Sequence, residues 1–115
     1  MTASPLPAAE SRRLAIWNAA VGLLHAVQGT LILVLANDAS LPVYASWTDG
    51  PPPIATPIQG EPLFALPIGL AMAVFLYLAA IDHLIVASPL ARPWYERNLA
   101  RGINYARWWE YSLSA

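Results

Sequence analysis

Residues 14–36, LAIWNAAVGLLHAVQGTLILVLA, form the apolar stretch that decides the fold of this chain. As a helix this stretch is roughly 35 Å long, which is enough to cross a hydrocarbon core of about 30 Å. Residues 63–87, LFALPIGLAMAVFLYLAAIDHLIVA, form a second stretch of the same kind. Both are predicted to be transmembrane helices. A cleaved signal peptide is the alternative for the first, although its apolar run exceeds the roughly 7–15 residues of a signal sequence.

The composition also favours a membrane protein. Of the 115 residues, 57% are hydrophobic and only 11% are charged, whereas a soluble domain carries about 25% charged residues. The net charge of -1 gives no reason to expect nucleic-acid binding. Cysteine is absent, so thiolate metal sites and disulfides are excluded. No nucleophile constellation or phosphate loop is present, and we expect no enzyme.

The segment between the two stretches, residues 37–62, contains six of the eleven prolines. Leu41–Thr48 is rich in strand formers, Asp49 and Gly50 form a turn signal, and a second extended piece is expected at residues 54–58. We predict a short β-hairpin on the membrane surface, limited by the prolines to a few ladder bonds.

The fold class predicted from these features is an all-α membrane protein with two transmembrane helices, the start of a third, and the hairpin. Asn104 is the predicted N-cap of the third helix. Because a membrane helix that begins there needs more residues than follow, we expect a larger protein with further helices. The predicted organisation is a tail 1–13 and a transmembrane domain 14–115, comprising helix 14–36, outer loop 37–62, helix 63–87, connector 88–103 and the start of a third helix, 104–115.

Arginine placement predicts the orientation of these helices. All six basic residues are arginines, and none lies in residues 37–62; they are Arg12, Arg13, Arg92, Arg97, Arg101 and Arg107. Under the positive-inside rule the N-terminus and the connector are cytoplasmic and the proline-rich loop is outside. The expected location is an integral protein of the cell membrane, with the lipid bilayer as its surroundings.

Each long helix carries one face of small and polar residues. These are Asn18, Gly22, His25 and Gly29 on the first, and Gly69, Ala73, Leu76, Ala80 and His83 on the second. Such faces point towards other helices, because lipid offers no hydrogen-bond partners. Glu110 enters its helix from the cytoplasmic end, where His83 also lies. We therefore expect His25, His83 and Glu110 to meet in the inner half of a helix bundle.

Simpler roles stay open for each of these groups. A single histidine in a span can hydrogen-bond a backbone carbonyl, and Asp82 can reach the headgroups. Arg107 and Glu110 are spaced i, i+3 and can form a surface ion pair. A metal site is disfavoured, because the two histidines and the carboxylate lie on three helices without ligand spacing.

Four segments together resemble a known family: RRLAIWNAAVGLLHAVQG, NDASLPVYASWTDGPPP, AIDHLIVASP and YERNLARGINYARWWEYSLSA. In this order they are similar to the N-terminal third to half of heliorhodopsins, light-responsive seven-helix retinal proteins. The similarity runs from Arg12 to Ala115, and the last segment is its most specific part.

The resemblance implies a partial seven-helix rhodopsin-like bundle with a cytoplasmic N-terminus, inverted relative to other microbial rhodopsins. It implies that Glu110 is the Schiff-base counterion and that His25 and His83 belong to an inner cavity that handles protons. It also implies hairpin contacts in a homodimer, and a sensory or regulatory role without ion pumping. Retinal in this family is attached to a lysine of the seventh helix, and this chain contains no lysine.

Three functions follow from the sequence. The first is the N-terminal fragment of a heliorhodopsin-like photoreceptor, which alone forms no pigment. The second is a standalone membrane hairpin that acts as a structural or interaction module without a chromophore. The third is a subunit of a proton-handling membrane enzyme or transporter, which rests on His25, His83 and Glu110 alone.

Overall fold

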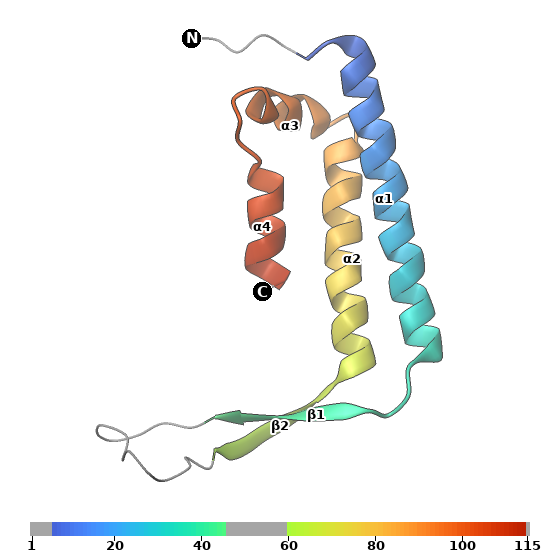
Figure 1. Cartoon of the computed structure of the whole chain (residues 1–115), viewed down its shortest axis with the longest axis vertical. Helices are drawn as coiled ribbons and strands as arrows, with labels where there is room; N and C mark the ends of the chain where they lie inside the picture. The colour runs from blue at the N-terminus through green and yellow to red at the C-terminus, as the bar shows by residue number, and fades with distance from the viewer. Residues whose placement is uncertain (1–5, 46–59, 115) are drawn as a thin grey trace, which may run out of the picture.

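The computed structural model describes residues 6–45 and 60–114. The elements in these ranges are α1 (Ala8–Leu35), β1 (Ser40–Ala45), β2 (Glu61–Pro67), α2 (Ile68–Ala87), α3 (Arg92–Leu99) and α4 (Tyr105–Ser114). Helices α1 and α2 lie side by side and antiparallel, with the hairpin of β1 and β2 projecting from one end (Figure 1). At the other end α3 turns the chain, and α4 runs back beside α2.

Two helices of the described residues, α1 and α2, are long and apolar enough to cross a membrane. Their shared interior is made of small residues: Ala73 and Ala80 are almost completely buried. Large apolar side chains lie on the outside, with Val34 and Leu35 about three-quarters exposed, at 75% and 78%. Small residues inside and large apolar residues outside are the arrangement expected of helices that associate within lipid.

Helix α1 begins six residues earlier than predicted, so residues 8–13 belong to the helix and not to the tail. Pro7 precedes its first turn, and the Ser11 backbone N–H donates to the Pro7 carbonyl at 3.0 Å. Ala8, Ala9 and Glu10 favour a helix, and Glu10 also suits the positive end of its dipole. The apolar stretch used for the prediction identifies only the part of the helix that suits the hydrocarbon core. The helix itself extends beyond that part at its N-terminus.

Residues 63–67 were predicted as the start of the second helix, and this was wrong because they belong to strand β2. Pro67 holds Leu66 in an extended conformation and lacks an N–H, so the helix begins only at Ile68. An apolar run does not by itself distinguish a strand from a helix.

A hairpin forms as predicted, but its described second strand is β2. Strands β1 and β2 pair antiparallel from Ser40 with Pro67 to Ala45 with Glu61, with an irregularity between Val43 and Tyr44. The predicted turn at Asp49 and Gly50 and the predicted extended piece at residues 54–58 both lie outside the described residues. Both strands are edges, which is where prolines are tolerated.

The connector 88–103 contains a helix, α3, that the sequence analysis did not predict. The Ser88 hydroxyl accepts a bond from the Ala91 N–H at 3.2 Å before the helix, and Gly102, with φ of 75°, follows it. The Gly102 N–H donates to Leu99 and the Ile103 N–H to Asn98, at 2.9 and 3.0 Å, closing a C-terminal turn that requires a left-handed residue. This turn reverses the chain and sends α4 back beside α2.

Candidate functional site: a polar cavity beside α4

The site is built on the close contact of α1 with α2. Gly22 and Gly29 are the buried residues of α1. A Cβ at Gly22 would lie 2.9 Å from Leu84 Cγ and 3.1 Å from the Ala80 carbonyl oxygen, so only glycine fits without a shift. The predicted small-residue faces do meet, and their contact lets short polar side chains bridge the two helices.

His83 is held by Asn18 across this contact. The Asn18 side-chain NH₂ donates to the Leu14 carbonyl at 2.9 Å, which leaves its Oδ1 to accept a bond from His83 Nδ1 at 2.8 Å. In this arrangement Nδ1 carries the proton of the neutral ring, and Nε2 is the nitrogen that gains or loses one. Asn18 therefore fixes both the orientation and the tautomer of His83.

The two predicted histidines lie together. The His25 and His83 rings stack with centroids 5.7 Å apart and an angle of 29° between their planes. His25 Nδ1 also lies 3.1 Å from Gln28 Oε1 on its own helix. The two imidazole rings are therefore in contact across the α1–α2 interface, so polar groups of α1 and α2 are adjacent there.

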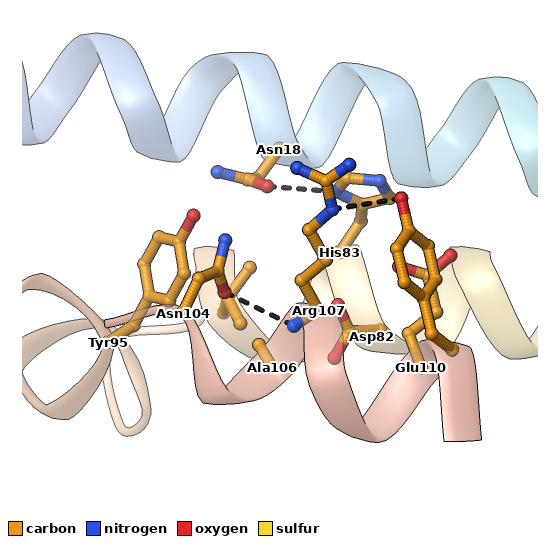
Figure 2. A pocket seen from close by; sticks show the side chains of 10 residues that line it. Asn18, Asp82, His83, Tyr95, Asn104, Ala106, Arg107 and Glu110 are labelled. Atoms are coloured by element: carbon orange, nitrogen blue, oxygen red, sulfur yellow. Dashed lines mark hydrogen bonds between the residues drawn. The ribbon is translucent and has the colours of Figure 1, made fainter. Parts of the chain in front are cut away.

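A polar cavity of about 330 Å³ opens where α4 approaches α1 and α2 (Figure 2). Both His83 and Glu110 line it, from α2 and α4 respectively. The complete lining comprises Asn18, Asp82, His83, Val86, Tyr95, Asn104, Ala106, Arg107, Glu110 and Tyr111. Two carboxylates, an imidazole and a guanidinium therefore face one space among apolar helices.

Helix α4 is positioned by the residue that precedes it, Asn104, and by its own side chains. Asn104 acts as the N-cap, as predicted: its Oδ1 accepts from the Arg107 N–H at 3.1 Å. The Arg107 guanidinium lies over the Tyr111 ring at 5.0 Å, and its Nε donates to the Tyr111 hydroxyl at 2.9 Å. This arrangement, drawn in Figure 2, sets the charged groups of α4 along the cavity wall.

Tyr95 enters the cavity from α3, outside the membrane-spanning segments. Its burial raises the pKa of the phenol above the ordinary value of 10.0, and the nearby Asp82 carboxylate adds to the rise. Asn104 and Asn18 act in the opposite direction on the same pKa. Tyr95 therefore contributes a neutral hydroxyl to the cavity wall, close enough to Asp82 for that charge to affect its pKa.

The predicted site residues are brought together in part. His83 and Glu110 share the cavity, while His25 reaches it only through its stack on His83. Sequence reasoning missed Tyr95 and assigned Asp82 to the headgroups, whereas the structure places Asp82 on the cavity wall. A signal was available for Asp82, because an ionisable residue inside an apolar span usually faces other helices or a polar cavity and not lipid.

No group of histidine, aspartate or glutamate side chains among residues 6–45 and 60–114 is arranged to hold a metal ion. Antiparallel membrane helices around a carboxylate–histidine cavity define the class: a helical membrane protein with an internal ionisable site.

Comparison with known proteins specifies the family. Residues 14–115 match the heliorhodopsin family, and the chain belongs to it. Heliorhodopsins are rhodopsins, so the family implies a retinal-binding membrane protein. A search of the curated proteins found no match to the chain.

Proposed function

We propose that this chain supplies the counterion side of a light-sensing, retinal-binding photoreceptor of sensory or regulatory function. The observation that carries this proposal is that Glu110 and His83 line one cavity within the region matched to the family. Retinal, when bound as a protonated Schiff base, supplies a buried cation and a light-driven change in its position. A buried cation needs a nearby anion to keep its proton at neutral pH.

The residues of the cavity fit this requirement on the counterion side only. Glu110 is half-buried and offers the anion, and the polar wall around it offers hydrogen bonds. The covalent attachment does not come from this chain, because none of its 115 residues is a lysine. The attachment lysine therefore has to come from another segment of the protein.

Within this proposal the other cavity residues hold and relay a proton. Asn18 keeps the His83 Nδ1–H engaged, so Nε2 is left to accept a proton released near Glu110. The His25 ring stacked on His83 extends the polar path towards mid-membrane. A cytoplasmic N-terminus and a homodimer formed through the β1–β2 hairpin belong to the same proposal, supported by the arginine distribution and by family resemblance.

The test uses the full-length protein reconstituted with retinal. Glu110→Gln should shift the visible absorption maximum and lower the Schiff-base pKa by about 1 to 3 pH units, because it removes the anion beside the cation. Glu61→Gln, an exposed carboxylate on β2, is the matched control and should change neither quantity. An unaltered spectrum and titration in Glu110→Gln would refute the counterion assignment.

The chain alone provides a second test. Residues 1–115 mixed with retinal should give no stable visible pigment, because a buried Schiff base requires the amine of a side chain and the chain has no lysine. After reduction, a retinyl group attached anywhere other than the N-terminal amine would contradict the argument from composition.

A further inference from the structure

The cavity contains a second carboxylate to which the proposed function gives no role. Asp82 lies on α2, one residue before His83, and is half-buried. Figure 2 places its side chain between α2 and α4, on the side where Arg107 and Glu110 project. Asp82 and Glu110 thus face the same space of about 330 Å³ from two different helices.

The charged and titratable groups around Asp82 come from several elements. On its own helix the neighbour is His83, and α3 contributes Tyr95. Helix α4 contributes Arg107, Glu110 and Tyr111. From α1 the cavity receives the uncharged amide of Asn18, with His25 behind the His83 ring. Strand β2 lies at the opposite end of α2 (Figure 1).

These surroundings do not suit two negative charges. Arg107 is the one guanidinium lining the cavity, and its single positive charge can balance one of the two carboxylates but not both. Tyr95 presents a neutral hydroxyl to the same cavity and supplies no compensating charge. Two carboxylates in one poorly solvated site ionise in two coupled steps, because the first charge opposes the second.

We propose that Asp82 and Glu110 form a coupled pair that shares one proton, and that Asp82 thereby sets the charge of the counterion. This inference rests on the proposed function, in which Glu110 balances the Schiff base. While Asp82 holds the shared proton, Glu110 carries the negative charge that the cation requires. If the proton moves to Glu110, the charge moves to Asp82 on α2, and the cavity keeps its net charge while the counterion changes helix.

The test is a pH titration of the colour of the full-length pigment. Asp82→Asn keeps the size of the side chain and removes one of the two like charges. The high-pH step, in which the wild-type pair loses its shared proton and takes a second charge, should therefore vanish from the titration. The acid step, in which Asp82 is already neutral, should stay in place. Asp82→Glu, which keeps a carboxyl group, should restore a transition close to the wild-type one. Asp38→Asn, on the loop after α1, is the control and should leave the midpoint unchanged.

A second measurement covers a variant that gives no pigment. In the wild-type protein without retinal, the infrared difference spectrum between acid and neutral pH should contain the carbonyl band of a protonated carboxyl group. Asp82→Glu should displace that band, because the group that carries the proton has changed.

The outcomes separate the two proposals. If Glu110→Gln leaves the colour unchanged, the proposed function fails. If Glu110→Gln shifts the colour but Asp82→Asn keeps the high-pH step and Asp82→Glu leaves the carbonyl band in place, the shared proton is refuted and the counterion assignment stands.

Discussion

The two ends of the α1–α2 pair are both packed through small residues, but they differ in how tightly the helices approach and in which side chains lie beside the contact. At the hairpin end Gly29 lies against Ala73, Leu76 and Tyr77 at ordinary van der Waals distances of 3.4 to 3.5 Å from a built Cβ. At the α4 end the same measure at Gly22 is 2.9 Å, and polar groups fill the space beyond.

Hydrogen bonding between the helices shows the same difference. At the hairpin end the Thr30 hydroxyl donates to Ala26 at 2.8 Å, so it accepts from the Tyr77 hydroxyl at 2.7 Å. Both hydroxyl groups are satisfied. At the α4 end Asn18 bonds the imidazole of His83, which lines a cavity together with two carboxylates. The comparison indicates that both ends hold the helices together and that ionisable side chains also line the contact at the α4 end.

Alanine at the two glycines gives the largest expected contrast. Gly22→Ala should destabilise the folded protein by about 1–3 kcal/mol, because the added methyl group meets the Ala80 carbonyl and Leu84. Gly29→Ala should be nearly neutral, since its contacts are ordinary and alanine favours a helix by about 1 kcal/mol over glycine. Thermal or denaturant unfolding of the detergent-solubilised protein measures both. Equal losses at the two positions would show that the ends are packed alike.

Removing one interhelical hydrogen bond at each end gives the next largest effect. Asn18→Leu should cost about 1–2 kcal/mol, because it leaves the part-buried Nδ1–H of His83 without its partner. Tyr77→Phe should cost about 0.6 kcal/mol, the usual value for such a bond in a membrane protein. Only Asn18→Leu should also alter the pH dependence of the pigment, because it releases the His83 tautomer. If the pH profile of the pigment changes equally in both variants, the two ends of the helix pair do not differ in their effect on pH dependence.

Tyr95 gives the smallest effect, confined to alkaline pH. Its pKa is raised in the folded protein, so folding favours the neutral phenol. The corresponding stability is complete below the ordinary pKa of 10.0 and is lost as the pH rises through the higher folded value. Tyr95→Phe should remove a late component from the tyrosinate absorbance titration and reduce the loss of stability above pH 10. Tyr44→Phe, on the exposed strand β1, is the control that should leave the late component in place.

The sequence predicted which helices carry the site more reliably than it predicted where the helices begin and end. Hydropathy located both membrane helices, and helical spacing put Asn18, Gly22 and His83 on the faces that meet. Hydropathy misplaced the start of α2 by five residues, because residues 63–67 are apolar and an apolar segment of this length can form either a strand or a helix. Helix α3 escaped prediction because it is eight residues long and polar, with no apolar run to mark it.

The sequence by itself determined the two membrane helices, their small-residue faces, the absence of a lysine and the resemblance to heliorhodopsins. These properties depend on residue type and on spacing along one helix, which are local. It is the tertiary structure that places Asp82, Tyr95 and Glu110 around one cavity. That arrangement depends on the reversal at Gly102, which brings α4 back beside α2. The direction of a returning helix is set by contacts between distant residues, so a single chain's spacing cannot specify it.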